Sequence, residues 1–361
     1  MSSVFEPVAA ATGGTSGGVR GACDRGTGDV QSRACVVPLD PASYRAHALH
    51  GADRAWPETN CYTDLLIEVV HAMGHEPLAM LGFTLAMDFE GDQWTFFKPS
   101  HADLLDLYGL DVQELAIWRP LVDHVEEQAR RGRLALVEVD AFYLPDTAGT
   151  AYRREHVKTT VGVNRIDLGA RHLGYFHNAG YFELEGEDFA QLFQLDGAPH
   201  ARVLPPYVEM LKPVAAFERL PSAQLAQRSR ERLRQHVRRI PASNPFEAFK
   251  RRFARDLEWL RGSPLEAFHA YSFANLRQYG ACFGLAASHL QWLATQGVQG
   301  LAAAGGHFED IATTAKNLQF QLARAMARQK ALDLSPVDAM AAAWQQAMDS
   351  LAASIASAPG P

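Results

Sequence analysis

Hydrophobic residues change their spacing along the 361-residue chain, and the changes divide it into three regions. Residues 1–35 are rich in Gly, Ser, Thr and Ala and show no periodic apolar pattern, which predicts a disordered segment. Over residues 36–220 helical spacing is mixed with strand-like alternation, and from 221 to 361 the spacing is helical. The pattern therefore predicts an α+β domain over 36–220 followed by a helical domain over 221–361.

Within the α+β region the helical patterns come first. Apolar spacing there predicts a helix from Cys61 to about Met73. A short helix or strand, then a strand, then two further helices are expected to follow, over residues 76–89, 91–99, 101–110 and 112–132 respectively.

After these helices the apolar spacing changes to the alternation that is typical of strands. Alternating or β-branched segments cover residues 133–144, 156–164 and 173–185. From Ser222 onward helices are predicted, with breaks at Pro241, Pro245, Pro264, the pair Gly305 and Gly306, and Pro336.

The composition, 47% hydrophobic and 21% charged, is that of a globular protein. No apolar run approaches the roughly 20 residues that cross a bilayer, and the first residues lack the basic and apolar segments of a signal peptide. The four cysteines are far apart and lack CxxC spacing, which argues against a zinc knuckle or a disulfide framework. We therefore expect a cytoplasmic protein with no bound metal and no membrane partner.

The formal net charge of −7 conceals a basic segment in the helical region. Residues 221–262 contain eleven Lys and Arg but only four Asp and Glu. Such a segment either is a solvated helix face or attracts something anionic, such as a nucleic acid, a membrane surface or an acidic carrier protein. Aromatic residues are not interleaved with the basic ones, which argues against nucleic acid.

Cys61 is placed at the start of the predicted helix. A thiol there lies at the positive end of the helix dipole, among unpaired N–H groups, and both favour the reactive thiolate. Free cysteine is also among the most buried residue types, so the alternative is a small core residue. A nucleophilic cysteine needs a base and usually an orienting group.

A histidine and an asparagine are placed to supply these two groups. His156 begins one predicted strand, and Asn178 ends the strand that returns after a turn-prone segment. A hairpin centred near Asp167 would bring the two side by side, so that the Asn178 amide holds the imidazole toward the thiol. His177 is a rival base, but strand alternation points it to the opposite face. The pattern predicts a triad of Cys61, His156 and Asn178.

Four segments carry a resemblance to a known family: WPETNCYTDLLIEV, FEGDQWTFFKP, VEVDAFYLPDTAGTAYRREHVKTT and YFHNAGYFELEGEDF. They resemble a bacterial family filed as domain of unknown function 1839, and the match covers most of the chain after residue 50. The middle portion is more distantly similar to the amino-terminal domain of the butirosin acyltransferase and to bacteriocin-processing cysteine peptidases. The resemblance implies a papain-like core in which Cys61 is the nucleophile, His156 the base and Asn178 the orienting residue.

Other residues are candidates for binding at the site. Papain-like peptidases usually place a glutamine several residues before the nucleophile, whereas this chain has DRAWPET there. The candidate oxyanion donors are then the backbone N–H of Cys61 and the side chain of Asn60. Asp140 ends a predicted strand and either caps the next turn or binds an amine at the rim of the site. Lys316 and Gln319 share a polar helical face, which either is solvated or forms a wall of the site.

A thiolate that attacks a carbonyl gives a thioester, whose acyl group passes to water in a hydrolase or to an amine in an acyltransferase. The butirosin resemblance and the basic segment favour transfer. With no cofactor of its own, the protein is expected to take an acyl or aminoacyl group from the phosphopantetheine arm of a carrier protein, through Cys61, to a small-molecule or peptide amine. The carrier would dock on the basic segment 228–261, chiefly on Arg228, Arg230, Arg232, Arg234, Arg238 and Arg239. A cysteine peptidase or amidase, and a non-catalytic binding protein on a papain-like core, are the alternatives.

Overall fold

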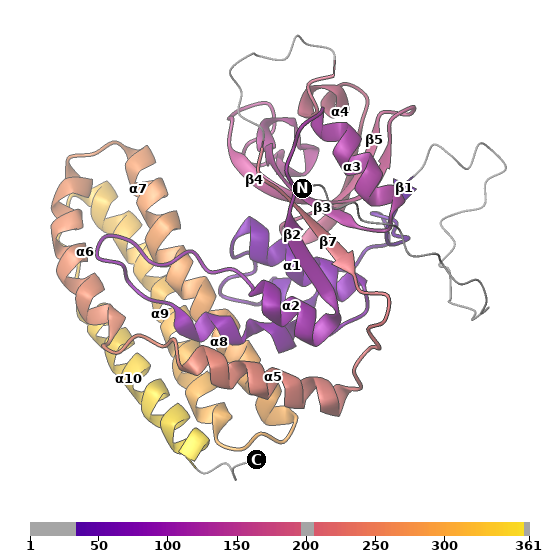
Figure 1. Ribbon diagram of the computed structural model, residues 1–361. Coiled ribbons are helices and arrows are strands. Elements are labelled where there is room, and N and C mark those ends of the chain that lie inside the picture. The colour runs from indigo at the N-terminus through magenta and orange to yellow at the C-terminus, as the bar shows by residue number, and fades with distance from the viewer. Residues whose placement is uncertain (1–33, 196–205, 357–361) are drawn as a thin grey trace, which may run out of the picture.

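The computed structural model describes residues 34–195 and 206–356, and Figure 1 shows an antiparallel sheet joined to a helical region. The fold class is α+β as expected, and the described chain after residue 222 forms helices alone. Most of the predicted disordered segment 1–35 lies outside the described residues. Ala34–Cys35 are described and form strand β1 against β4, so the prediction is wrong for these two residues.

Seven strands, all paired antiparallel, make up the described sheet. Six lie in the order β2-β7-β3-β4-β5-β6, and β1 pairs with β4 beside them. After β1 their bounds are Leu110–Glu114 (β2), Leu134–Asp140 (β3), Lys158–Asp167 (β4), His172–His177 (β5), Gly180–Glu185 (β6) and Val208–Pro213 (β7).

Helices cover both faces of the sheet. On one face α1 (Cys61–Ala72) packs on β4 and β5, and it approaches closely at Gly162, which has no side chain. On the other face α3 (Leu121–Arg130) packs in a separate cluster with Val137 and Val161. Because strand residues alternate between faces, the sheet separates two apolar cores.

Two segments of the first region differ from the prediction. A single bridge forms over 91–99 in place of the expected strand. Residues 110–114, expected as parts of helices, form the edge strand β2, and the next helix begins only at Leu121. The reason is Pro120, because proline disfavours a helix interior and suits the position just before a helix starts.

The helical region is confirmed, but one predicted break is absent. Gly305 and Gly306 lie inside a helix, where Gly305 allows close packing against Gln291 of the preceding helix. None of the described helices is both long and apolar enough to span a membrane. A π-helical stretch, Phe273–Arg277, joins the third helix of this region to the fourth. The remaining bounds are α2 (His101–Tyr108), α4 (Glu187–Leu192), α5 (Ser222–Val237), α6 (Pro245–Arg261), α7 (Leu265–Ser272), α8 (Gln278–Thr295), α9 (Leu301–Arg328), α10 (Ser335–Ala356) and a 3-10 helix over Pro77–Ala86.

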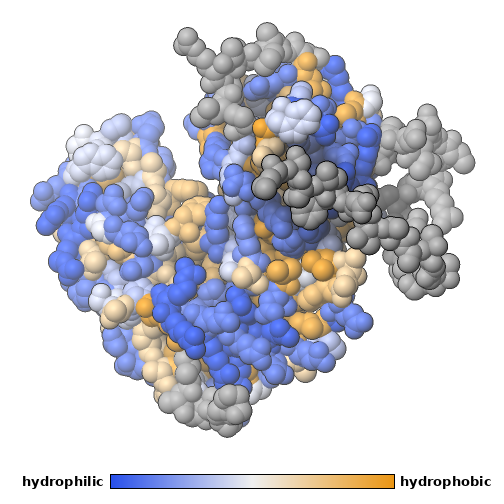
Figure 2. Space-filling model, viewed as in Figure 1, coloured by the Kyte–Doolittle hydropathy of each residue, from blue (hydrophilic) through white to orange (hydrophobic). Residues whose placement is uncertain are grey.

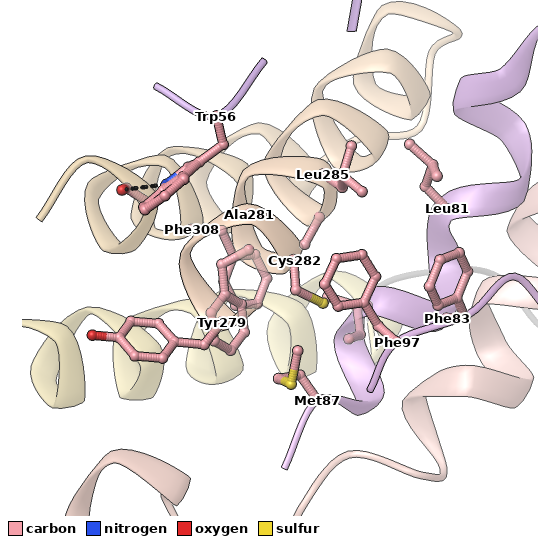
Figure 3. Packing of buried hydrophobic residues seen from close by; sticks show 14 of the residues in the cluster. Trp56, Leu81, Phe83, Met87, Phe97, Tyr279, Ala281, Cys282, Leu285 and Phe308 are labelled. Atoms are coloured by element: carbon pink, nitrogen blue, oxygen red, sulfur yellow. Dashed lines mark hydrogen bonds between the residues drawn. The ribbon is translucent and has the colours of Figure 1, made fainter. Parts of the chain in front are cut away.

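The sheet region and the helical region share one apolar core. Figure 3 shows Cys282 of α8 pointing into this core, near Met87 and Phe97. Cys282 is fully buried, and burial raises the pKa of its thiol well above the usual range. Both the burial and the raised pKa disfavour the reactive thiolate form of Cys282.

Trp56 is inserted between α8 and α9. Its indole Nε1 donates to a backbone carbonyl of α9, that of Ala312, at 2.9 Å (Figure 3). Its ring lies so close to Gly280 that a Cβ atom there would be 2.7 Å from it. Arg54 donates to the hydroxyl of Ser288 at 2.9 Å. The segment that leads into α1 is therefore fixed to the helical region.

Gly280→Ala should lower the free energy of unfolding by about 1–3 kcal/mol, because the added methyl group overlaps the ring of Trp56. Gly306→Ala is the matched control, since Gly306 lies exposed in α9 with no neighbouring atom near its missing Cβ. That substitution should raise the free energy of unfolding by about 0.5–1 kcal/mol. Urea unfolding followed by circular dichroism measures both changes, and effects of the same sign and size would contradict the close packing.

Candidate active site

Cys61 is the first residue of α1 and lies partly buried between the helix and the sheet, with its Sγ 3.8 Å from Thr160 Oγ1. Asn60 caps the helix. Its side-chain oxygen accepts from the N–H of Thr63 at 2.9 Å, and its amide donates to the carbonyl of Phe97 at 3.1 Å. Asn60 is therefore engaged in the cap and not directed at an oxyanion, whereas the N–H of Cys61 is one that a helix leaves without an internal partner.

A buried carboxylate fixes the turn before Cys61. Asp64 accepts from the N–H and the hydroxyl of Thr59, both at 2.6 Å, and lies 3.4 Å from Nε2 of His50. His50 also contacts Glu68, one turn further along α1, at 2.5 Å. Burial alone lowers the pKa of His50, but its bonds to the two carboxylates outweigh this and raise the pKa to about 9. The buried imidazolium therefore offsets the charges of Asp64 and Glu68.

Polar residues form a row across the sheet at the level where α1 begins. Tyr207, just before β7, accepts a backbone hydrogen bond from Glu138 at 3.1 Å, and Glu138 lies opposite Thr160. Cys61 therefore faces a polar floor, whereas the rest of α1 packs on the apolar part of the same face.

His156 lies just before β4, beyond the polar row. Its Nδ1 is 2.6 Å from Oδ2 of Asp140, and its ring stacks on Phe142 at a centroid distance of 4.3 Å. The side chain is 66% exposed. Four residues of extended chain separate it from Thr160, or about 13 Å between Cα atoms. No hydrogen bond between these two described residues links His156 to Cys61 in this conformation.

The predicted juxtaposition of His156 and Asn178 is wrong. Asp167 pairs with His172, so the hairpin turns beyond Asp167 instead of around it. Phe176, two residues before Asn178, pairs with Gly162, so β5 ends well before the level of His156. Asn178 itself occupies the turn between β5 and β6 with φ of 45°, a left-handed conformation that asparagine adopts more readily than most residues.

Asp140 contacts the ring of His156, where the sequence pattern predicts Asn178. One of its oxygens accepts from the N–H of Phe142 at 3.0 Å, which is the expected turn cap, and the other holds His156. The contact arises because Asp140 pairs with Lys158, at the start of β4. The signal in the sequence is the acidic residue at the end of the alternating run that becomes β3. Because β3 and β4 are antiparallel, the end of β3 lies beside the start of β4, directly after His156.

His177 lies on the other face of the sheet, as strand alternation predicts. It is buried, with Nδ1 2.6 Å from Asp146 and Nε2 2.8 Å from the hydroxyl of Thr159. Thr159 and Thr160 are neighbours in β4 and point to opposite faces, so His177 and Cys61 are on opposite sides of the sheet. This histidine is not placed to serve the thiol.

A cluster beside the start of α1 has no counterpart in the sequence interpretation. Tyr62 donates to Glu209 at 2.6 Å and lies 3.1 Å from Nε2 of His101, and Tyr207 donates to the other oxygen of Glu209 at 2.8 Å. The ammonium of Lys98 lies 4.4 Å from the centre of the Tyr62 ring. Burial, and then the bond to Glu209, raise the pKa of Tyr62, and the same causes raise the pKa of Tyr207 to about 12. These residues come from separate segments, so no local pattern indicates them.

Two cations of the helical region reach the segment before Cys61. Arg277, in the π-helical stretch, donates through Nε to the carbonyl of Thr59 at 3.1 Å. Lys316 of α9 places its ammonium 4.3 Å from the centre of the Trp56 ring. Gln319, the other residue proposed for this wall, instead joins α9 to the end of α7 through a hydrogen bond of 2.9 Å.

The basic segment is partly engaged within the fold. Arg228 binds Asp106 at 2.8 Å and Arg232 binds the buried carboxylate of Asp103, so both fix α5 to α2. These two arginines serve the fold, contrary to the expectation that all six dock a carrier. Figure 2 shows hydrophilic residues gathered over α5. Within the described parts of the chain, no ion pair involves the other four, Arg230, Arg234, Arg238 and Arg239.

The fold and the site define an α+β protein with a thiol at a helix N-terminus above an antiparallel sheet. Residues 45–213 match the DUF1839 N-terminal domain and residues 222–353 match the DUF1839 C-terminal domain. The chain therefore belongs to the DUF1839 family. No curated protein matches it. In the described ranges, no group of three or more His, Cys, Asp or Glu is arranged to hold a metal ion.

His50→Gln should remove a pH-dependent part of the stability. Because the pKa of His50 is raised from 6.5, the value for an unperturbed side chain, to about 9 in the folded protein, its ion pairs stabilise the fold fully below about pH 6.5 and lose effect as pH rises through 9. The variant should unfold more easily than wild type by roughly 2–3 kcal/mol near pH 6, and the difference should shrink toward pH 10.

Urea unfolding across this pH range measures the difference, with the exposed His269→Gln as the control that should show no such trend. A destabilisation by His50→Gln that is the same at every pH would contradict a charged His50.

Proposed function

We propose that the protein is a cysteine-dependent acyl or aminoacyl transferase with a papain-like core, in which Cys61 carries the acyl group as a thioester. The donor is the phosphopantetheine thioester of a carrier protein, and the acceptor is an amine. The position of Cys61 carries the proposal: the thiol is partly exposed at a capped helix N-terminus and faces a polar floor, unlike the buried Cys282. Reactive cysteines in other proteins are found at helix N-termini.

The first step transfers the acyl group to the protein. The thiolate of Cys61 attacks the carbonyl carbon of the donor thioester, and the backbone N–H of Cys61 donates to the oxyanion that forms. The bond between the carbonyl carbon and the carrier sulfur then breaks, and the carrier thiol leaves with a proton from the imidazolium of His156. Asp140, bonded to the other ring nitrogen, keeps the imidazole oriented.

The second step transfers the acyl group to the amine. The amine attacks the thioester on Cys61, and neutral His156 accepts the proton that the amine nitrogen loses. The amide leaves, Cys61 returns as the thiolate, and His156 returns as the imidazolium. Atoms and charges are thus restored after one turnover.

His156 must move toward Cys61 for these steps. Its ring is exposed and stacked on Phe142, and residues 155–157 belong to no helix or strand. A shift of this connection, together with rotation of the side chain, closes the gap along the sheet. Catalytic contacts are often long before substrate binds and tighten in the complex.

Two features favour transfer over hydrolysis. The segments that resemble the butirosin acyltransferase include Cys61, Asp140 and His156. Four arginines in α5 and directly after it form no ion pair among the described residues: Arg230, Arg234, Arg238 and Arg239. They offer a positive surface to an acidic carrier. A peptidase would act on peptides without any carrier, so the donor requirement separates the two functions.

Cys61→Ala should abolish formation of an acyl adduct, because the alanine side chain offers no nucleophile. Wild type and variant are mixed with aminoacyl-loaded carrier proteins and, separately, with peptide thioesters, and intact-protein mass spectrometry detects the adduct. Cys35→Ser is the matched control and should acylate normally, because Cys35 lies on β1, away from the start of α1. An adduct of equal yield on Cys61→Ala would end the proposal.

His156→Gln should slow acylation of Cys61 by about 10²–10⁴-fold, the usual contribution of a positioned acid and base. Asp140→Asn should also slow acylation, because an amide in place of the carboxylate changes which nitrogen of His156 carries the proton and how the imidazole ring is oriented. His177→Gln is the control. Its acylation rate per folded molecule should equal that of wild type, with the folded fraction determined by circular dichroism. Loss of activity in His177→Gln but not in His156→Gln would reverse the assignment of the base.

A further inference from the structure

Arg277 and Lys316 bring two positive charges to one short stretch of chain. The guanidinium of Arg277 contacts the carbonyl of Thr59 at 3.1 Å and lies 3.7 Å from the carboxylate of Glu58, while Lys316 lies over Trp56. The two cations come from the π-helical stretch and from α9, and the stretch they reach belongs to the first region. Only the complete fold places them together.

These charges are incompletely neutralised. The side chain of Glu58 is 52% exposed, and no carboxylate among the described residues forms an ion pair with Lys316. Partial burial lowers the pKa of Lys316, and the nearby charge of Arg277 lowers it further. An anion bound near both groups would relieve this repulsion.

Exposed aromatic rings flank the two cations. Phe273 is 53% exposed and lies 5.1 Å from the Arg277 guanidinium carbon, and Phe320 is 56% exposed and lies 5.7 Å from the Lys316 ammonium. Charged groups with apolar surface beside them suit a ligand that has an anionic end and a short hydrocarbon chain.

We infer that Arg277 and Lys316 bind a carboxylate carried by one of the two reactants, either the acyl group on Cys61 or the amine that attacks it. The inference rests on the proposed transfer reaction. Thr59 is two residues before Cys61, at most about 7 Å along the chain, so a reactant with a few bonds between its reacting atom and its carboxylate spans the gap. The phosphate of a pantetheine arm lies at the end of a much longer chain and does not fit so short a gap.

In the donor arm of the test, the full-length protein reacts with each of two thioesters, and the two acylation rates are compared. Glutaryl-pantetheine and valeryl-pantetheine have acyl chains of equal length, and only the glutaryl chain ends in a carboxylate. The acceptor arm compares loss of the acyl group to 4-aminobutyrate and to 4-aminobutyramide, which differ in the same way. Intact-protein mass spectrometry follows both reactions at Cys61.

One arm should show a preference of about tenfold or more for the carboxylate, because charge-assisted hydrogen bonds to Arg and Lys are strong. Lys316→Gln should remove the preference, whereas Lys316→Arg, which keeps the positive charge, should retain it. Arg324→Gln is the matched control, an exposed cation two turns further along α9, and should keep the preference. Arg277→Gln gives supporting evidence only, because it also removes the bond to Thr59.

Equal rates with and without the carboxylate in both arms, or a preference that survives Lys316→Gln, would overturn the inference and leave the proposed transfer intact. If no thioester acylates Cys61, the proposed function itself fails and the inference falls with it.

Discussion

Burial of the Asp64 carboxylate, less than one turn after Cys61, is the constraint on which the candidate site depends. A buried carboxylate is strongly unfavourable unless hydrogen bonds and an opposite charge compensate it. Thr59 supplies two hydrogen bonds and His50 supplies the charge, so the chain before the helix has one well-defined path. The cysteine is consequently held at the first position of α1, with its thiol between the helix end and the sheet.

Residues of the helical region hold the same turn in place, so the two matched family domains contact each other directly before Cys61. Trp56 is inserted between α8 and α9, and Arg277 binds the carbonyl of Thr59. The thiol therefore faces Thr160 in the polar row of the sheet, while the residues just before it contact Arg277 and Lys316 of the helical region.

Local patterns predicted the parts of the fold that short stretches of sequence encode. The helix that begins with Cys61, the alternating strands and the helical region are of this kind, because each has its own periodicity. Pairing between strands is not local, so the hairpin register and the contact between Asp140 and His156 were missed. The cluster around Glu209 was also missed. Its members come from separate segments of the chain and come into contact only when α1 packs against the sheet.

In the proposed mechanism Cys61 is the nucleophile, and His156, held by Asp140, is its acid and base. A crystal structure of the full chain with an acyl group trapped on Cys61, prepared without an amine, tests this most directly. The proposed mechanism predicts that the imidazole of His156 leaves the ring of Phe142 and comes within hydrogen-bond distance of Cys61 Sγ, directly or through one water molecule. An acylated Cys61 with His156 still stacked on Phe142, and with another side chain beside the thioester, would contradict it.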